Sequence, residues 1–267
     1  MTQVATGSAK VVATKEGGVG TLTFDNRERH NALSLDMWEG AGTVLENFAA
    51  DPDVRVVVVT GAGGKAFVSG ADISRFEDER ASQEAFERYN AAVERTSTLL
   101  HEFPKPTIAK IRGWCLGGGV GLAVCCDMRL CNEAARFAVP AAKLGIGYAY
   151  EGVKMVVDLV GPAFAKEIFF TARQFTAAEA HGMGLVNRVL PDAELDAYVA
   201  DYAATIAGNA PLTVAAAKVA ILQAVKDESQ RDLARCEAMV HACFVSEDYV
   251  EGRRAFMEKR KPAFRGA

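Results

Sequence analysis

Hydrophobic and polar positions follow two different periods in the first part of the chain. Residues 19–25 alternate with a period of two, which is typical of a strand with one buried face. In residues 35–50 the apolar side chains recur at helical spacing, with Ser34 ahead of them as the expected N-cap. Residues 54–60 are almost wholly apolar and β-branched, which predicts a strand buried on both faces.

This alternation of strand and helix patterns continues to about residue 139. Residues 83–101 predict an amphipathic helix, which Pro104 and Pro106 separate from the next segment. Three further strands are expected at residues 107–111, 128–131 and 136–139. Strands that alternate with helices over this length favour an α/β fold.

The last part of the chain has a helical pattern only. Four helices are expected, at residues 193–208, 212–225, 230–245 and 249–259. Pro211 suits the first turn of the second of these helices. We therefore expect an α/β core at residues 1–191 and a helical C-terminal region at residues 192–267.

The composition of the chain argues against a nucleic-acid-binding protein and against a membrane-spanning or secreted one. The chain has 267 residues, 50% of them hydrophobic, which is enough for a substantial core. A net charge of −4 argues against a nucleic-acid partner, because a phosphate backbone requires a basic face. No stretch is apolar enough to span a bilayer, and residues 1–15 lack the apolar run of a secretory signal. We expect a cytoplasmic protein without membrane contact.

The six cysteines do not predict a metal or redox site. None of them forms a C-x-x-C pair, so a zinc ribbon or a dithiol motif is not supported. Cys236, His241 and Cys243 are close in sequence, but small buried thiols beside a surface histidine explain them better than metal ligation. We expect free thiols and no metal.

Two glycine-rich loops follow predicted strands and raise the question of phosphate binding. Residues 61–65 fail the P-loop pattern, because Val58 replaces the first glycine and Ala66 replaces the Ser or Thr after the lysine. The loop at residues 117–119 fails the dinucleotide pattern, because Leu122 occupies the last glycine position. Two interpretations remain open: an oxyanion hole built from backbone amides, or glycines that only allow tight helix packing.

Several segments resemble a known family in its own order along the chain. The resemblance covers nearly the whole sequence and rests on residues 29–34, 65–73, 113–122, 126–129, 136–140, 177–187 and 251–262. Together these segments resemble the crotonase (enoyl-CoA hydratase/isomerase) superfamily. The resemblance implies a spiral of β-β-α units with a helical C-terminal region, assembled as a homotrimer or a dimer of trimers.

The resemblance also implies a ligand and the residues that contact it. The ligand is an acyl-CoA thioester, and no cofactor is expected beyond its coenzyme A moiety. By motif position, the amides of Ala71 and Gly118 hold the thioester carbonyl oxygen. The adenine and pantetheine side is lined by the loop 66–71, with Ala66, Phe67, Ser69 and Ala71. Phe256 and Lys259 match positions that touch the CoA nucleotide, in some relatives from a neighbouring subunit, although Lys259 is equally well explained as a solvated charge.

This sequence departs from the pattern at the positions of the hydratase glutamates. Gly121 and Ala141 occupy the two positions where family hydratases carry carboxylates that activate water and deliver a proton. Ala149 stands near the position of the aspartate of family dehalogenases, so that reaction also lacks its nucleophile.

Four other polar residues, Tyr148, Glu151, Asp72 and Asp127, lie near the expected site. Tyr148 matches a tyrosine of some family decarboxylases and is a candidate to orient a carboxylate and supply a proton; the alternative is core packing. Glu151 is a second candidate acid or base; the alternative is a carboxylate that caps the helix expected to begin at Gly152. We interpret Asp72 as a helix cap, and Asp127 as a partner of Arg129 or of a backbone group.

These observations predict an acyl-CoA enzyme of the enoyl-CoA hydratase/isomerase family, a lyase or isomerase that stabilises a thioester enolate. Isomerisation and hydration by other groups both stay open as its reaction. Loss of both glutamates leaves two alternatives beside it: an acyl-CoA decarboxylase similar to methylmalonyl-CoA decarboxylase, or an acyl-CoA binding protein without activity. An unrelated nucleotide-binding α/β protein is disfavoured by the failed phosphate motifs.

Overall fold

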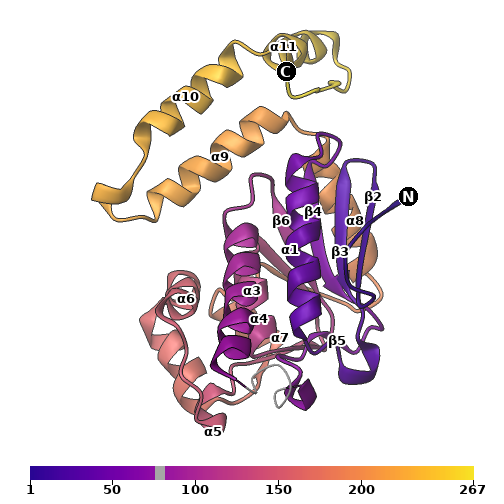
Figure 1. Cartoon of the computed structure of the whole chain (residues 1–267). Coiled ribbons are helices and arrows are strands. Elements are labelled where there is room, and N and C mark those ends of the chain that lie inside the picture. The colour runs from indigo at the N-terminus through magenta and orange to yellow at the C-terminus, as the bar shows by residue number, and fades with distance from the viewer. Residues whose placement is uncertain (76–81) are drawn as a thin grey trace.

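A seven-stranded sheet forms the centre of the molecule (Figure 1). The computed structural model describes residues 1–75 and 82–267. Strands β3 to β11 run parallel, and β1 and β2 add an antiparallel edge. The order in the sheet is β1 (Thr2–Val4), β2 (Val11–Glu16), β3 (Val19–Phe24), β4 (Val56–Gly61), β6 (Thr107–Ile111), β8 (Met128–Asn132) and β11 (Arg188–Leu190).

A second sheet of four strands is built from the segments that directly follow three strands of the first sheet. Strand β5 follows β4, β7 follows β6, and β9 follows β8, and these three short strands pair in parallel. Strand β10 closes the edge beside β9 in antiparallel orientation. The bounds are β5 (Ala66–Val68), β7 (Trp114–Leu116), β9 (Arg136–Ala138) and β10 (Phe175–Thr176). The repeated strand-strand-helix order confirms the predicted α/β spiral.

The helices of the core cover both faces of the large sheet. Val57 and Val59 of β4 pack in the main core with α1 (Leu35–Ala50) and α3 (Gln83–His101), which have the predicted bounds. Val56 and Val58 point to the other face, because side chains alternate along a strand, and they pack against α8 (Leu195–Ala207). The strand expected at 54–60 is thus buried on both faces, as predicted.

Two helix starts differ in detail from the sequence prediction. Ser34 precedes α1 as expected, but its hydroxyl does not cap the helix and instead donates to Asp36 Oδ1 at 2.6 Å. Helix α6 begins at Tyr150, two residues earlier than expected, and bends at Gly161, which has a φ of 73°. The remaining elements are η1 (Arg27–Arg29), η2 (Ile73–Arg75), α4 (Gly118–Cys125), α5 (Ala141–Leu144), α6 (Tyr150–Thr171), α7 (Ala177–Gly182) and η3 (Glu228–Gln230).

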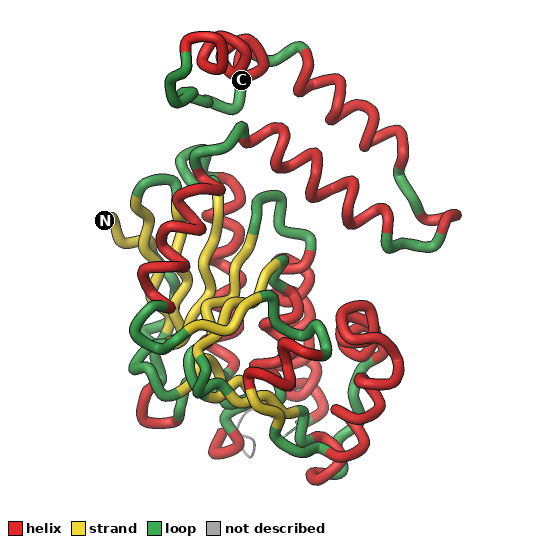
Figure 2. The backbone as a smooth tube through the Cα atoms, turned by 180° about the vertical axis from the view of Figure 1, so that it is seen from behind, coloured by secondary structure: helices red, strands yellow, loops and turns green. Residues whose placement is uncertain are grey.

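The last three helices extend away from the sheets (Figures 1 and 2). They are α9 (Pro211–Ala224), α10 (Leu233–Phe244) and α11 (Glu247–Glu258), in the predicted order. Lys218 of α9 reaches the core, where its Nζ lies 2.8 Å from Asp127 Oδ2 and donates to Lys105 O at 3.0 Å. Helix α10 buries none of its side chains in this chain. The division at residue 191 stays a prediction, because α8 itself covers the sheet.

Among the described residues, no helix by itself has the length and apolar character to cross a membrane. Helices α8 and α9 meet that criterion only as a pair, by length and composition, and they are bent by 103° to one another.

Candidate active site

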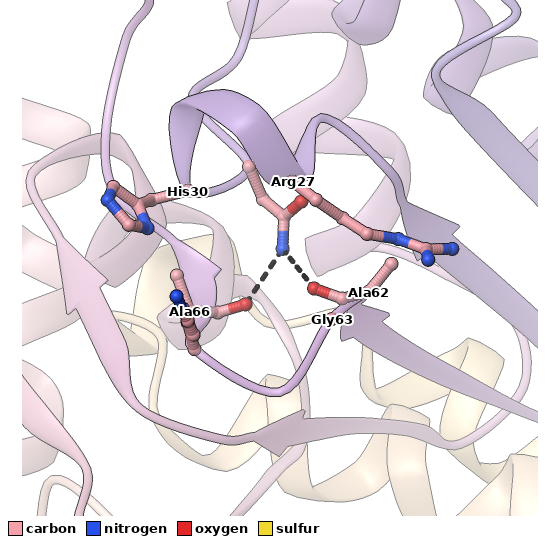
Figure 3. Close-up of a pocket in the computed structure, with 7 residues that line it drawn as sticks. Arg27, His30, Ala62, Gly63 and Ala66 are labelled. Carbon is pink, nitrogen blue, oxygen red and sulfur yellow. Dashed lines mark hydrogen bonds between the residues drawn. The ribbon is translucent and has the colours of Figure 1, made fainter.

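The first glycine-rich loop leaves β5 and is fixed to the segment that precedes α1. Leu33 N donates to Gly70 O at 2.8 Å, and Asp72 N donates to Leu33 O at 2.9 Å. Asn31 Nδ2 donates to the carbonyls of Ala62 and Ala66 at 2.9 and 2.8 Å (Figure 3). These bonds hold the loop 69–71 on both sides. Its position is therefore set by the backbone and by one buried amide side chain.

The second glycine-rich loop leaves β7 and turns directly into α4. Gly117 has a φ of 52° and a ψ of −116°, a conformation that favours glycine, and its amide donates to Ala138 O at 2.8 Å. Gly118 is the first residue of α4, so its amide has no partner within the helix. The helix N-terminus also favours negative charge at this amide.

The fold brings these two loops into contact. A Cβ atom on Gly117 would lie 3.8 Å from Cα of Gly70, and a Cβ on Gly70 would lie 3.4 Å from Leu116 O. Neither Ala71 nor Gly118 donates its amide to another group in the described ranges 1–75 and 82–267. Two unused backbone donors on adjacent loops are the arrangement that an oxyanion hole requires.

Gly119, which follows Gly118 in the second glycine-rich loop, packs closely against strand β5. A Cβ on Gly119 would lie 2.2 Å from Val68 O, so α4 rests directly on β5 at this residue. The packing interpretation therefore holds at Gly119. The oxyanion-hole interpretation stays a prediction for Gly118, whose amide has no partner within the helix.

Gly119→Ala is expected to lower the free energy of unfolding by about 3 kcal/mol, because the added methyl group overlaps a backbone carbonyl that cannot move aside. Helix propensity alone would give the opposite sign, since alanine favours a helix over glycine. Urea unfolding measures the difference. The matched control is Gly121→Ala, whose Cβ meets nothing closer than Tyr148 Oη at 3.5 Å. Equal stability of the two variants would contradict the close packing of α4 on β5.

Tyr148 occupies the space beside the first position that lacks a glutamate. Its Oη lies 3.5 Å from where a Cβ of Gly121 would be, and its hydroxyl donates to Gly117 O at 3.5 Å, which is long. The ring packs edge-on against Phe169, with the ring centroids 5.2 Å apart. Burial raises the pKa of the Tyr148 hydroxyl to about 12, so it stays neutral near pH 7. Tyr148 thus packs in the core and also reaches the glycine-rich helix.

Ala141, the second position that lacks a hydratase glutamate, is also close to the glycine-rich loops. Ala141 begins α5, and its neighbour Pro140 has Cδ 3.8 Å from where a Cβ of Gly117 would lie. Glu151 is exposed in the first turn of α6, and its side chain forms neither a hydrogen bond nor an ion pair with any residue that the structure describes. The roles of Tyr148 and Glu151 in catalysis stay predictions.

The residues expected to contact CoA divide into two groups. Ala66 lines a cavity of about 150 Å³, with Arg27, His30 and Lys65 around it. His30 and Arg27 lie on opposite sides of the Asn31 hydrogen bonds (Figure 3). Sequence reasoning assigned no role to these three basic residues, although His30 and Lys65 lie within two segments of the resemblance and Arg27 lies just before one of them. His30 Nδ1 is buried without a hydrogen-bond partner in the described part of the chain.

Other members of the expected CoA set are placed differently. Phe67 is fully buried in the core, so only its backbone is near the loop. Ser69 Oγ donates to Arg29 O at 3.2 Å. Phe256 is 83% exposed on α11, and Lys259 follows that helix, which lies at the far end of the molecule from β5 (Figure 1). A single chain therefore does not bring Phe256 and Lys259 to the loop.

The two aspartates near the site have structural partners. Asp72 Oδ1 accepts from Ser74 N at 3.2 Å and caps η2, as expected. Asp127 Oδ2 accepts from Thr107 N at 2.7 Å, which confirms a backbone partner. The Asp127 carboxylate does not pair with Arg129 but with Lys218. The Arg129 side chain donates to the backbone carbonyls of Leu185 and Cys126, and at 3.5 Å to that of Asp127.

Among the described residues, no group of three or more His, Cys, Asp or Glu side chains is placed to share a metal ion. All six cysteines are free, and four of them are buried. Burial raises the pKa of the Cys125 thiol to about 12, which keeps it protonated and weakly nucleophilic.

Comparison with known proteins places the chain in a family. The family model described as "Enoyl-CoA hydratase/isomerase" matches residues 14–267. The chain belongs to this family, within the crotonase superfamily. It is 35% identical to the short-chain-enoyl-CoA hydratase of Clostridium acetobutylicum, over 94% of this chain and 95% of that protein. It is 34% identical to the crotonyl-CoA hydratase of Syntrophomonas wolfei, over 95% and 97% of the two chains.

Solved structures of enoyl-CoA hydratase/isomerase family proteins have the same fold. The crystal structure of an enoyl-CoA hydratase/carnithine racemase from Magnetospirillum magneticum gives a TM-score of 0.91 at 36% identity, covering 99% of this chain and 97% of that one. An enoyl-CoA hydratase from Geobacillus kaustophilus gives 0.90 at 28% identity, with both chains fully covered. The family fold and an acyl-CoA enzyme related to the hydratases are therefore established, while the reaction depends on this chain's own site.

Proposed function

We propose that this chain is an acyl-CoA thioester enzyme that stabilises a thioester enolate between the amides of Ala71 and Gly118. The observation that carries the proposal is the contact between the two glycine-rich loops, with both amides unused by the described residues. Negative charge on the carbonyl oxygen grows as the enolate forms. Two fixed donors therefore stabilise the transition state more than the bound substrate.

Hydration by two carboxylates is not supported by the residues of this chain. Gly121 and Ala141 cannot exchange a proton or bind a water through a side chain. Glu151 is the carboxylate at the start of α6, but its side chain is exposed. We therefore do not propose ordinary hydratase chemistry, although similar proteins carry hydratase names.

Decarboxylation of a malonyl-type thioester fits the site better, and Tyr148 is the observation that favours it. The bond between the α-carbon and the carboxylate breaks, carbon dioxide leaves, and the bonding electrons form the enolate. No base is needed to remove a proton. The enolate carbon then takes a proton, for which the neutral Tyr148 hydroxyl is placed beside Gly121, and solvent returns the proton to the phenolate.

The cavity beside Ala66 supports a place for the nucleotide part of coenzyme A. Its wall carries Arg27, His30 and Lys65, and cationic side chains suit phosphate groups. Arg27 is held by Asp25, with Nη2 at 2.7 Å from Oδ2, so its charge is partly balanced. Lys65 and His30 are then the principal contributors to phosphate binding.

We also propose that the chain assembles as a homotrimer or a dimer of trimers. Large apolar side chains are exposed on all three terminal helices, among them Ile221, Phe244 and Phe256, at 66%, 61% and 83%. Such a surface is typical of protein interfaces. Assembly would also allow Phe256 and Lys259 to reach the CoA site of another subunit, which they do not reach in their own.

Mass spectrometry of CoA thioesters after incubation with the purified protein tests the proposed reaction. The panel holds malonyl-, methylmalonyl- and 2-enoyl-CoA thioesters of several chain lengths. We expect loss of carbon dioxide from a malonyl-type thioester. Gain of water on an enoyl-CoA would overturn the inference drawn from Gly121 and Ala141. Binding of thioesters without any change of mass in this panel would favour the binding protein over the decarboxylase.

A further inference from the structure

The side chain of Trp38 lies against the glycine that carries one of the two proposed oxyanion donors. Trp38 is in the first turn of α1, and its Cζ2 is 3.9 Å from where a Cβ of Gly118 would be. The indole is 3% exposed. The edge of this buried ring therefore lies within van der Waals distance of the Cβ position of Gly118, the residue that carries the proposed donor.

Trp38 is held in place by α3. Its Nε1 donates to Tyr89 Oη at 3.3 Å, and its carbonyl oxygen accepts from Thr96 Oγ1 at 2.9 Å. Tyr89 is 4% exposed, and Thr96 is fully buried. A buried indole with its N–H satisfied and its backbone fixed has little freedom to turn aside. The Trp38–Tyr89 pair is therefore a rigid wall.

A second aromatic side chain lies near the same face of α4. Gly118 and Gly121 are three residues apart in the helix, so they share a face. Trp38 contacts this face at Gly118, and Tyr148 contacts it at Gly121. Three residues of helix rise only about 4.5 Å. The helix surface between Gly118, where Trp38 makes its contact, and Gly121, where Tyr148 makes its contact, is therefore short.

We infer that the Trp38–Tyr89 pair closes the acyl pocket and restricts the enzyme to thioesters of short acyl groups. This inference rests on the proposed function, because it needs the thioester carbonyl at the Ala71 and Gly118 amides. With the carbonyl oxygen fixed there, the acyl group lies over the glycine face, between the indole edge and the Tyr148 hydroxyl. A chain of a few carbons fills that length, whereas a longer chain would have to displace Trp38 from its hydrogen bonds.

The affinities of saturated acyl-CoA thioesters, measured by calorimetry, test whether Trp38 and Tyr89 limit the length of the acyl chain. This measurement does not require turnover. The probes are butyryl-CoA, octanoyl-CoA and free coenzyme A, and the proteins are the wild type, Trp38→Ala, Trp38→Leu and Tyr89→Phe. We expect the wild type to bind butyryl-CoA at least tenfold more tightly than octanoyl-CoA. Trp38→Ala and Trp38→Leu remove the ring and should reduce or reverse that ratio. Tyr89→Phe removes the hydrogen bond but keeps the ring, so its ratio should change less.

The outcomes separate this inference from the function on which it rests. If the wild type binds no thioester better than free coenzyme A, the proposed function fails and the inference fails with it. If the wild type binds thioesters but its chain-length ratio is unchanged in the folded Trp38 variants, only the wall is wrong. Trp38→Leu keeps a large apolar side chain, so it serves where Trp38→Ala does not fold. Melting temperatures identify the folded variants.

Discussion

Gly118→Pro is expected to lower turnover of an acyl-CoA substrate by about 10²–10³-fold while the protein stays folded, because one oxyanion-hole donor contributes about that much. Proline has no N–H and carries its ring Cδ in that place, so the substitution removes the proposed donor and also fills the position next to it. Gly118 is the first residue of α4, where proline is well tolerated. The residue before a proline prefers an extended backbone with a ψ of about 120° to 160°. Gly117 has a ψ of −116°, which is close to the mirror image of that range, and glycine adopts an extended conformation and its mirror image about equally well.

The matched control is Gly118→Ala, which keeps the N–H. Its Cβ meets nothing closer than Trp38 Cζ2 at 3.9 Å, an ordinary contact. We expect this variant to retain turnover within a few-fold of the wild type. Steady-state kinetics on the thioester that the wild type converts, with circular dichroism to verify folding, provides the comparison. Equal turnover of the two variants would mean that the Gly118 amide does not bind the reacting oxygen.

Tyr148→Phe is expected to slow release of carbon dioxide from a malonyl-type thioester by about 10²-fold, the lower part of the range for a positioned proton donor. The phenylalanine ring keeps the edge-on packing with Phe169 and removes only the hydroxyl beside Gly121. The control is Tyr150→Phe, two residues away and 73% exposed, which should leave the rate unchanged. The measurement is single-turnover decarboxylation followed by mass spectrometry.

The raised pKa of Tyr148 adds a pH signature. Desolvation keeps the hydroxyl protonated in the folded protein up to a pKa of about 12, above the ordinary value of about 10. We therefore expect that deprotonation of Tyr148 does not lower the rate of decarboxylation below about pH 10. If Tyr148→Phe decarboxylates as fast as the wild type across this range, water supplies the proton and Tyr148 serves packing alone.

Sequence pattern was sufficient to predict the central strands and most of the long helices, but not the short strands β1, β5, β7 and β10 or the edge strand β2. The helices at residues 35–50 and 83–101 and the strand at residues 107–111 have the predicted bounds. The two helices have a repeating apolar face, and the strand is a short run that is buried on both faces. Both patterns depend only on neighbours a few residues away. Helix α6 was placed less well, because its start has no capping side chain and Gly161 interrupts its regular backbone.

The candidate site was predictable only where its chemistry is in the backbone. The donors Ala71 and Gly118 were proposed from motif positions in the family resemblance, and this assignment stays a prediction. Side-chain assignments were less certain. Phe67 belongs to the same motif but is buried in the core, and Asp127 pairs with Lys218 of a distant helix rather than with nearby Arg129.

The sequence by itself determined the family, the order of the elements and the absence of side chains with catalytic groups at Gly121 and Ala141. Only the tertiary structure decided that the two glycine-rich loops touch, that Tyr148 reaches Gly121, and that Trp38 lies against Gly118. The physical reason is the range of the interactions. Periodicity and motif spacing record what a segment does locally, whereas these contacts join segments that are far apart in sequence and form only when the strands pair and the helices pack.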